Sequence, residues 1–397
     1  MSEQSAPHRK GGGAHRSGAG GRVAAATSGE RTTGRRHVFG APGGGSDRSG
    51  GAATASLGAF RATDGTTGAP AAVDLDAPHV ALVVGKRGSG KSHTLGVLAE
   101  ELARAAGVAP VVVDPMGEFA GLTEGVPAAV RAPRVRAAAL TPRSWCALLD
   151  LDPAGAVGGL VWRAAARADS FAEMRALVES CSAEAPVARA AANHLRRAAG
   201  WGVFAPDGLG PADLRDGAAT VIDCGDLAAP ATGAVCHAVA TGLYESARAD
   251  DTGPLPWLLL DEAARHVDGA AAPALRTLLT RGRTPGVSVV LATQRPDALP
   301  AVAVSQADLL VAHRLTTAAD VSALERARPT YLRGSVGDRL PRATGAALVV
   351  DEATERAATV VVRERDTPHG GTTPRASDRA GVASSGDEQV VAATRPD

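Results

Sequence analysis

The fold class of this chain follows from one segment, Gly85-Lys86-Arg87-Gly88-Ser89-Gly90-Lys91-Ser92. The segment matches G-x-x-x-x-G-K-[ST], the Walker A loop, whose backbone N–H groups surround phosphates while its lysine reaches the β- and γ-phosphates. The chain has only three lysines, and two of them, Lys86 and Lys91, lie here. A compact ammonium fits such a phosphate nest better than the planar guanidinium of arginine, the cation used in the rest of the chain. The segment therefore predicts nucleotide binding.

The residues on either side of this loop complete the motif. Residues 80–84 form an apolar run typical of a buried strand, and residues 94–105 have a helical pattern. A phosphate bound between them would lie at the positive end of the helix dipole. We therefore expect the eight loop residues and the next residue, His93, to bind the nucleotide, with Ser92 also contacting Mg²⁺.

Short apolar runs alternate with helical patterns between residues 71 and 365, which indicates an α/β fold with a mostly parallel sheet and helices on both faces. The expected strands are residues 80–84, 108–113, 219–223, 256–260, 286–292, 308–313, 345–350 and 358–363. The long interval 122–216 contains helical stretches instead, at residues 144–149, 158–168, 171–179 and 186–199. We interpret this interval as a helical insertion into one nucleotide-binding domain.

The two ends of the chain have a different composition. Residues 1–70 and 366–397 are rich in Gly, Ser, Thr, Ala and Arg and contain few large apolar residues. Such segments bury too little apolar surface to offset the entropy lost on folding, so we predict disordered tails. The whole chain has 42 Lys plus Arg against 42 Asp plus Glu. The chain has no net charge that would attract a nucleic acid or a membrane surface, so either partner would have to bind to a local patch of positive charge.

Cysteines and hydropathy indicate the compartment. The four cysteines are far apart in the sequence and form no C-x-x-C pair, so neither a disulfide framework nor a zinc site is expected. No signal peptide is visible. The longest uncharged run, residues 227–244, contains Pro, Gly, Thr and His and suits a packed helix better than a membrane span. We expect a cytoplasmic protein with no membrane segment.

A second motif predicts metal binding and hydrolysis. The apolar residues 255–260 are followed by Asp261 and Glu262, which fits a Walker B strand. Adjacent side chains at a strand end point in different directions, so Asp261 can hold Mg²⁺ through water while Glu262 polarises the attacking water. An apolar run before Asp-Glu is also compatible with a strand capped by solvated carboxylates. The Walker A loop upstream favours the catalytic interpretation.

The following strand adds a candidate sensor and a candidate arginine finger. It ends in Gln294, whose amide can hydrogen-bond both the γ-phosphate and the attacking water. Arg276, Arg281 and Arg283 precede this strand. A ring-forming ATPase requires an arginine that reaches the γ-phosphate of a neighbouring subunit, and we expect Arg283, or else Arg281, in that role. Taken alone, these residues are also compatible with a loop start and with solvated charges.

Several segments together resemble the HerA branch of the HerA/FtsK P-loop ATPases. They are residues 85–101, Asp114-Pro115-Met116-Gly117-Glu118-Phe119, and residues 260–263, 282–287, 292–296, 305–306 and 344–349. The resemblance covers about residues 75–365. It implies a RecA-like core that binds ATP and Mg²⁺, hydrolyses ATP and assembles as a hexameric ring that threads DNA. It also implies the roles given above for Lys91, Ser92, Asp261, Glu262 and Gln294, with Arg283 acting across the subunit interface.

Three departures from the family pattern leave its biological role open. The N-terminal β-barrel of the family has no expected counterpart in residues 1–70, Ala264 stands where many relatives have His, and the helical insertion has no assigned function. A ring-shaped DNA translocase or helicase, with a nuclease or other protein partner, is the first interpretation. An ATPase that acts on a protein client or as a nucleotide-dependent switch is the alternative. A small-molecule kinase fits the Walker A loop but not Glu262 with Gln294.

Overall fold

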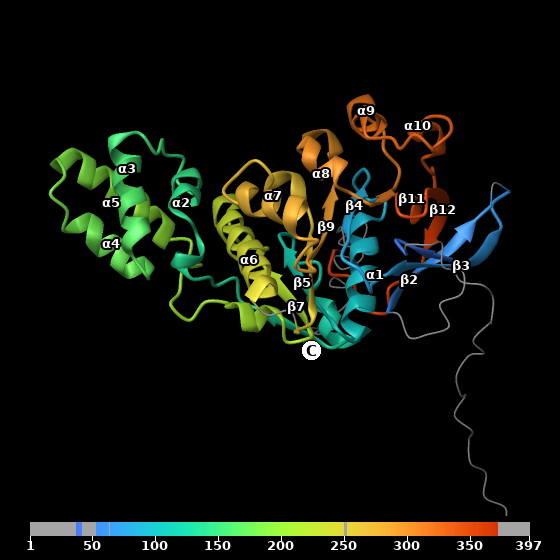
Figure 1. Cartoon of the computed structure of the whole chain (residues 1–397), viewed down its shortest axis with the longest axis horizontal. Helices are drawn as coiled ribbons and strands as arrows, with labels where there is room; N and C mark the ends of the chain where they lie inside the picture. Colours follow the sequence, from blue (N-terminus) through green and yellow to red (C-terminus); the bar gives the residue numbers. More distant parts are fainter. Residues whose placement is uncertain (1–36, 42–52, 63, 250–251, 372–397) are drawn as a thin grey trace, which may run out of the picture. The chain divides into compact units, whose positions relative to one another are not determined.

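The computed structural model describes residues 37–41, 53–62, 64–249 and 252–371 (Figure 1). The strands of this part of the chain form one sheet in the order β1-β3-β2-β12-β11-β10-β4-β9-β8-β5-β7-β6. Their bounds are β1 (His37–Phe39), β2 (Thr54–Arg61), β3 (Thr67–Asp74), β4 (Val80–Val84), β5 (Val108–Asp114), β6 (Ala128–Arg131), β7 (Ala219–Asp223), β8 (Leu255–Leu260), β9 (Ser288–Thr293), β10 (Leu309–Ala312), β11 (Ala346–Asp351) and β12 (Arg356–Val362).

The helices connect and cover these strands. The α-helices are α1 (Lys91–Arg104), α2 (Pro142–Leu148), α3 (Ala156–Arg167), α4 (Phe171–Glu179), α5 (Ala185–Ala199), α6 (Ala229–Ala249), α7 (Ala272–Arg281), α8 (Ala301–Ser305), α9 (Ala318–Arg326) and α10 (Val336–Arg339). The 3₁₀ helices are η1 (Ala120–Glu124), η2 (Ala137–Ala139), η3 (Pro211–Leu214), η4 (Ala263–Arg265) and η5 (Pro296–Ala298). None of these described helices is long and apolar enough to cross a membrane.

The centre of the sheet is parallel, as the sequence predicts. The neighbouring strands from β10 through β4, β9, β8, β5 and β7 to β6 all run in the same direction. Every residue of β5 and of β9 is buried, which explains why these strands are continuous apolar runs rather than alternating patterns. On the other side, β11, β12 and β2 continue the sheet in antiparallel pairs. The predicted α/β fold is confirmed.

Helices pack on both faces of the sheet. Successive side chains of a strand point to opposite faces. Ala81 and Val83 of β4 belong to a core cluster that includes apolar residues of α1, β2 and β12. Leu82 and Val84 belong to a second cluster that includes residues of α6 and α7. Because the parallel strands share one direction, their carboxyl ends meet at one edge, where β4, β8 and β9 deliver the residues of the two Walker motifs.

Helices α2 to α5 form a helical insertion, drawn in green in Figure 1. Each helical stretch expected from the sequence overlaps one of these helices. In their core, the Trp145 ring packs against Phe171 and Phe204, with centroids 5.6 and 4.7 Å apart. The expected range 122–216 is too wide, because β6 pairs with β7 and belongs to the sheet. Strand β6 has only four residues, Ala-Ala-Val-Arg, and therefore no recognisable apolar pattern.

The prediction of disorder over residues 1–70 is wrong for β1, β2 and the first part of β3. Strand β2 pairs with β12 on one side and β3 on the other, so these strands extend the main sheet. Ala55 and Leu57 of β2 are fully buried in the cluster shared with α1. Small residues dominate these strands, so pairing with an existing sheet edge, rather than a local apolar pattern, explains why they form. Residues 1–36 and 42–52 lie outside the described residues.

The predicted C-terminal boundary at residue 366 is also too early. Thr367 is buried, and its backbone N and Oγ1 donate hydrogen bonds to Glu100 Oε1 on α1, at 2.9 and 2.7 Å. These bonds join residues far apart in the sequence, so composition alone did not reveal that the segment is packed. The described chain continues to Gly371, and residues 372–397 fall outside it.

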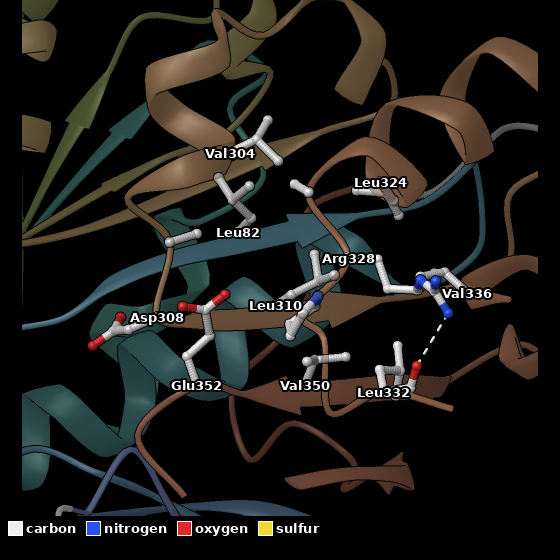
Figure 2. Close-up of a pocket in the computed structure, with 13 residues that line it drawn as sticks. Leu82, Val304, Asp308, Leu310, Leu324, Arg328, Leu332, Val336, Val350 and Glu352 are labelled. Carbon is white, nitrogen blue, oxygen red and sulfur yellow. Dashed lines mark hydrogen bonds between the residues drawn. The ribbon is translucent and has the colours of Figure 1, made fainter. Parts of the chain in front are cut away.

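A small cavity lies between the sheet and the α9–α10 region (Figure 2). Its volume is about 30 Å³, and Leu82, Leu310 and Val350 line its sheet side. This volume holds roughly one or two water molecules, so the cavity is a gap in packing rather than a ligand site. At its rim, the Arg328 guanidinium donates a hydrogen bond to the carbonyl oxygen of Leu332 at 3.1 Å, drawn as a dashed line in Figure 2.

Candidate nucleotide-binding site

The Walker A loop connects the end of β4 to the first residue of α1. Gly90, the residue before α1, has φ +119°, a conformation that side chains rarely adopt. A Cβ atom at Gly85 would lie 2.7 Å from His313 Cβ, so the loop needs glycine for close packing as well as for its conformation. The backbone of Lys86 donates to Arg314 O at 2.8 Å. These features fix the loop before any phosphate binds.

His313, which directly follows β10, packs against the Walker A loop. The residue is fully buried. One ring nitrogen, Nε2, lies 2.8 Å from Thr94 Oγ1, and the other, Nδ1, lies 2.9 Å from the carbonyl oxygen of Ala346. Burial lowers the pKa of His313 to about 4, so the ring is neutral at pH 7 and adds no charge under the loop. No local pattern predicts the contact between His313 and Thr94, because these residues lie 219 positions apart in the sequence.

Lys91 is poised to bind an anion. Its side chain is buried, and Nζ donates to the carbonyl oxygen of Lys86 at 3.3 Å. Burial lowers the pKa of Lys91, while the nearby carboxylates of Asp261, Glu262 and Glu118 oppose that shift. A buried ammonium with one long hydrogen bond to a neutral carbonyl gains strongly from a phosphate.

Ser92 and Asp261 lie together although they are far apart in the sequence. Ser92 Oγ donates to Asp261 Oδ2 at 2.8 Å, and Asp261 is 2% exposed. Burial raises the pKa of Asp261 to about 6, which means that the carboxylate lacks a compensating cation. One hydroxyl and one carboxylate, completed by water and phosphate oxygens, are a donor set that suits Mg²⁺. The residues present therefore fit the expected metal.

Glu262 and Gln294 come from neighbouring strands. Glu262 follows β8 and has φ +49°, and its backbone N donates to Asp261 Oδ1 at 2.8 Å. Gln294 follows β9, and its Nε2 donates to Glu262 Oε1. Because β8 and β9 are parallel and paired, their carboxyl ends bring both polar side chains to one place. A left-handed backbone is rarely adopted by residues other than glycine, and such conformations cluster at functional sites.

The side chains of Lys91, Ser92, Asp261, Glu262 and Gln294 all line one cavity of about 780 Å³. Of the predicted nucleotide-binding residues, the cavity is lined by Arg87, Gly88, Gly90, Lys91, Ser92 and His93. Gly85, Lys86 and Ser89 are not on its wall; they shape the loop behind it. The sequence did not identify several further lining residues, namely Arg265, Val361, Val362, Glu364, His369 and Gly371. Thr344 and Gly345 also line the cavity, and they lie in segment 344–349, which carries the family resemblance. Met116 and Glu118 also line it, and they occur in the segment that carries the family resemblance.

Arg283 is not at this cavity. It lies in the turn that precedes β9, and its guanidinium is 72% exposed and 3.9 Å from Asp308 Oδ2. Gln294 lies beyond the other end of β9, a strand of 6 residues that spans about 20 Å. The structure therefore separates Arg283 from its own Walker residues, and it places Arg265, from η4, on the cavity wall instead.

Replacing Asp261 by Asn should stabilise the protein in the absence of nucleotide. The pKa of this carboxyl is about 6 when folded against an ordinary value of 3.8, so the stability it contributes is present below pH 4 and is lost as the pH rises through 6. At pH 7.5 the neutral amide should raise the melting temperature by roughly 2–5 °C, and the gain should shrink towards pH 4. Melting curves over this pH range test it, with the exposed Asp268→Asn as control. An unchanged or lower melting temperature at pH 7.5 would contradict the conclusion that the buried Asp261 carboxylate lacks a compensating cation.

Comparison with known families covers the part of the chain that contains the Walker A loop. Residues 57–200 match the model of the family described as Helicase HerA, central domain. The matched region begins in β2 and includes the Walker A loop, α1 and most of the helical insertion. The expected resemblance to the HerA branch is confirmed. No curated protein sequence matches the chain.

Solved structures share the fold at low sequence identity. VirB4 of Thermoanaerobacter pseudethanolicus is 16% identical, with a TM-score of 0.62, over 79% of this chain and 97% of that chain. A truncated form of the bacterial conjugative coupling protein TrwB is 19% identical, with a TM-score of 0.53, over 77% of this chain and 89% of that chain. The plasmid coupling protein TrwB in complex with ADP and Mg²⁺ is 18% identical, with a TM-score of 0.52, over 73% and 87%.

Proposed function

We propose that this chain, which carries a P-loop ATPase domain of the HerA/FtsK type, hydrolyses ATP and uses the energy to move along DNA as a ring of subunits, six by family resemblance. The observation that carries the proposal is the convergence of Lys91, Asp261, Glu262 and Gln294 on one cavity at the carboxyl edge of a parallel sheet. In open parallel sheets this edge is the usual place for ligands. The family match supports an ATPase, and the DNA-moving role is the further step.

Each side chain has a distinct role in the proposed hydrolysis. Lys91 neutralises the β- and γ-phosphates, within the N–H groups of the loop. Glu262 accepts a hydrogen bond from the attacking water and increases its nucleophilicity. Gln294, which already donates to Glu262, holds that water in line with the γ-phosphate and senses whether the phosphate is present.

Ser92 and Asp261 would hold Mg²⁺, Ser92 directly and Asp261 through water. When bound, the ion neutralises charge on the phosphate oxygens. TrwB, which shares the fold, has been seen with ADP and Mg²⁺. The high pKa of Asp261 is consistent with a carboxylate that gains a cation when nucleotide enters. ATP and Mg²⁺ are therefore the proposed ligands.

We propose that the motor acts on DNA, and the alternative is that it acts on a protein client. TrwB is described as a plasmid coupling protein, and its shared fold supports a role in moving DNA. Exposed arginines on the helical insertion, such as Arg163 of α3 and Arg196 of α5, offer local positive charge in a chain without net charge. Others of its arginines are engaged within the chain, as Arg134 is with Asp207 at 3.1 Å. We place the protein in the cytoplasm, with a nuclease or other protein as a further partner.

Lys91→Ala, assayed with and without double-stranded DNA, tests the proposal. The wild-type ATPase should be stimulated several-fold by DNA, and the stimulation should weaken as salt rises. Lys91→Ala should lose at least about tenfold in ATP affinity and all measurable turnover, because the charge facing the phosphates is gone. The exposed Arg104→Ala, on the same helix, is a control. Turnover of Lys91→Ala within threefold of wild type would refute the ATP site; a wild-type rate indifferent to DNA would favour the protein-client alternative.

A further inference from the structure

The described chain continues beyond β12 as residues 363–371, here called the C-terminal strap, which crosses α1. The strap is fixed at Glu100, a carboxylate on α1 that is 0% exposed. Arg363 lies 2.8 Å from Glu100 Oε2, and Thr367 donates two hydrogen bonds to Oε1. Burial raises the pKa of Glu100, but the hydrogen bonds from Thr367 and Arg363 outweigh burial and lower it. A buried charge that is paired in this way is costly to separate, so the strap is part of the fold.

Glycines on the facing surface make room for the strap. A Cβ atom at Gly96 of α1 would lie 2.6 Å from Arg365 Cζ, and one at Gly121 would collide with the carbonyl oxygen of Pro368. The Arg365 guanidinium lies over the Phe119 ring, 5.7 Å from its centroid. These close contacts show that the strap and the surface under it are shaped to one another.

The far end of the strap reaches the nucleotide cavity. His369 and Gly371 line that cavity, together with Glu364 from the start of the strap and Val361 from β12. The backbone N of Gly370 donates to the carbonyl oxygen of Glu118 at 3.2 Å, which holds this end against the loop after β5. One wall of the cavity is therefore built from the C-terminal strap.

The chemistry of this wall does not suit phosphate. The Glu364 carboxylate repels phosphate but accepts hydrogen bonds from hydroxyl groups. Partial burial and the Arg365 guanidinium, which lies 3.2 Å from His369 Nδ1, lower the pKa of His369 against the opposing charge of Glu118. The ring is therefore neutral at pH 7 and offers an aromatic face and one N–H. Both side chains are exposed to the cavity. Hydroxyl groups and a flat aromatic ring are the parts of a nucleotide that match such a wall, while Lys91 and the loop N–H groups match its phosphates.

The strap is also tied to the phosphate loop itself. His93, directly after Ser92, places its Nε2 2.7 Å from the carbonyl oxygen of Arg363. The contact between His93 and Arg363 holds the strap next to the Walker A residues that would bind the phosphates. A ligand that bridges the loop and the strap is thus selected by length as well as by chemistry.

We propose that the C-terminal strap is the nucleoside-binding wall of the cavity, where the His369 ring contacts the base and the Glu364 carboxylate accepts hydrogen bonds from the ribose hydroxyls. The proposal rests on the proposed nucleotide-binding function of the cavity. It assigns a binding role to a segment that includes residues 366–371, which composition alone indicated to be part of a disordered tail.

The test compares a complete nucleotide with its phosphate part alone. Dissociation constants of the full chain are measured for ATP and for inorganic tripolyphosphate, both with Mg²⁺. His369→Ala should weaken ATP binding about tenfold, which corresponds to one base–aromatic contact, and should change tripolyphosphate binding by less than about twofold. His369→Phe should restore ATP binding to within about threefold of wild type. Glu364→Gln should reduce the preference for ATP over 2′,3′-dideoxy-ATP.

Controls separate this contact from a general effect on folding. Asp366→Asn changes an exposed strap residue that pairs with Arg104 at 2.8 Å and does not line the cavity, so it should leave both dissociation constants unchanged. If His369→Ala weakens ATP and tripolyphosphate equally, or weakens neither, the proposal is overturned. Failure of the nucleotide site itself has a different signature: wild type would bind neither ligand, or Lys91→Ala would bind both normally.

Discussion

Glu262→Gln is expected to bind ATP with near wild-type affinity and to hydrolyse it at least about 100-fold more slowly. The amide keeps the size of the side chain and an oxygen that can accept from Gln294, so the cavity should keep its shape. What it loses is the negative charge that polarises water. Purified Glu262→Gln protein should therefore hold ATP rather than ADP after incubation with Mg²⁺, as measured by chromatography of the released nucleotide.

The chain offers a close control for this substitution. Glu355, in the turn between β11 and β12, also has a left-handed backbone, with φ +52° against +49° for Glu262, but it does not line the cavity. Glu355→Gln makes the same chemical change under the same backbone constraint and should leave turnover unchanged. If Glu262→Gln lost nucleotide binding together with turnover, the residue would be structural rather than catalytic.

The central strands were predictable because burial on both faces leaves a direct signature. Strands β4, β5, β8 and β9 lie within two residues of the apolar runs in the sequence. Strands β1, β2 and β6 carry no such signature, since β1 and β6 are only three and four residues long, β2 is rich in small residues, and all three pair with neighbouring strands of the sheet. Such edge pairing depends on contacts between distant segments, which a local pattern does not encode.

The candidate site divides in the same way. The Walker A loop and the Asp-Glu pair are local patterns, and the structure brings them to one cavity with Gln294. His313, Arg265 and the C-terminal strap reach the site through tertiary packing from other parts of the chain. No local motif marks them, because their neighbours in space are not their neighbours in sequence. The roles of the Walker residues themselves stay predictions until the variants are measured.

Arg283 is the residue whose position most constrains the mechanism. Arg283 lies at the amino end of β9, whereas the Walker residues lie at the carboxyl ends of the strands. It therefore cannot reach the nucleotide site of its own subunit. In a head-to-tail ring, however, each subunit presents one surface to the site of the next. Charge that develops on the transferred phosphoryl group then meets an arginine supplied in trans, a contribution worth about a thousandfold or more in rate. Arg283→Ala should accordingly bind ATP normally and hydrolyse it about a thousandfold more slowly.

Mixing two inactive variants distinguishes this arrangement from a cation supplied within the subunit. When Arg283→Ala and Glu262→Gln subunits share a ring, some interfaces pair an intact Glu262 with an intact Arg283 from the neighbour, so part of the activity should return. Arg265 lines the cavity of its own subunit, and Arg265→Ala mixed with Glu262→Gln should therefore restore nothing, since every site still lacks one group. Recovery with Arg265→Ala but not with Arg283→Ala would reverse the assignment. Light scattering with ATP and Mg²⁺ measures whether the protein is a monomer under the assay conditions. If it is a monomer and hydrolyses ATP at the full rate, an arginine finger in trans is excluded, because no neighbouring subunit is present to supply it.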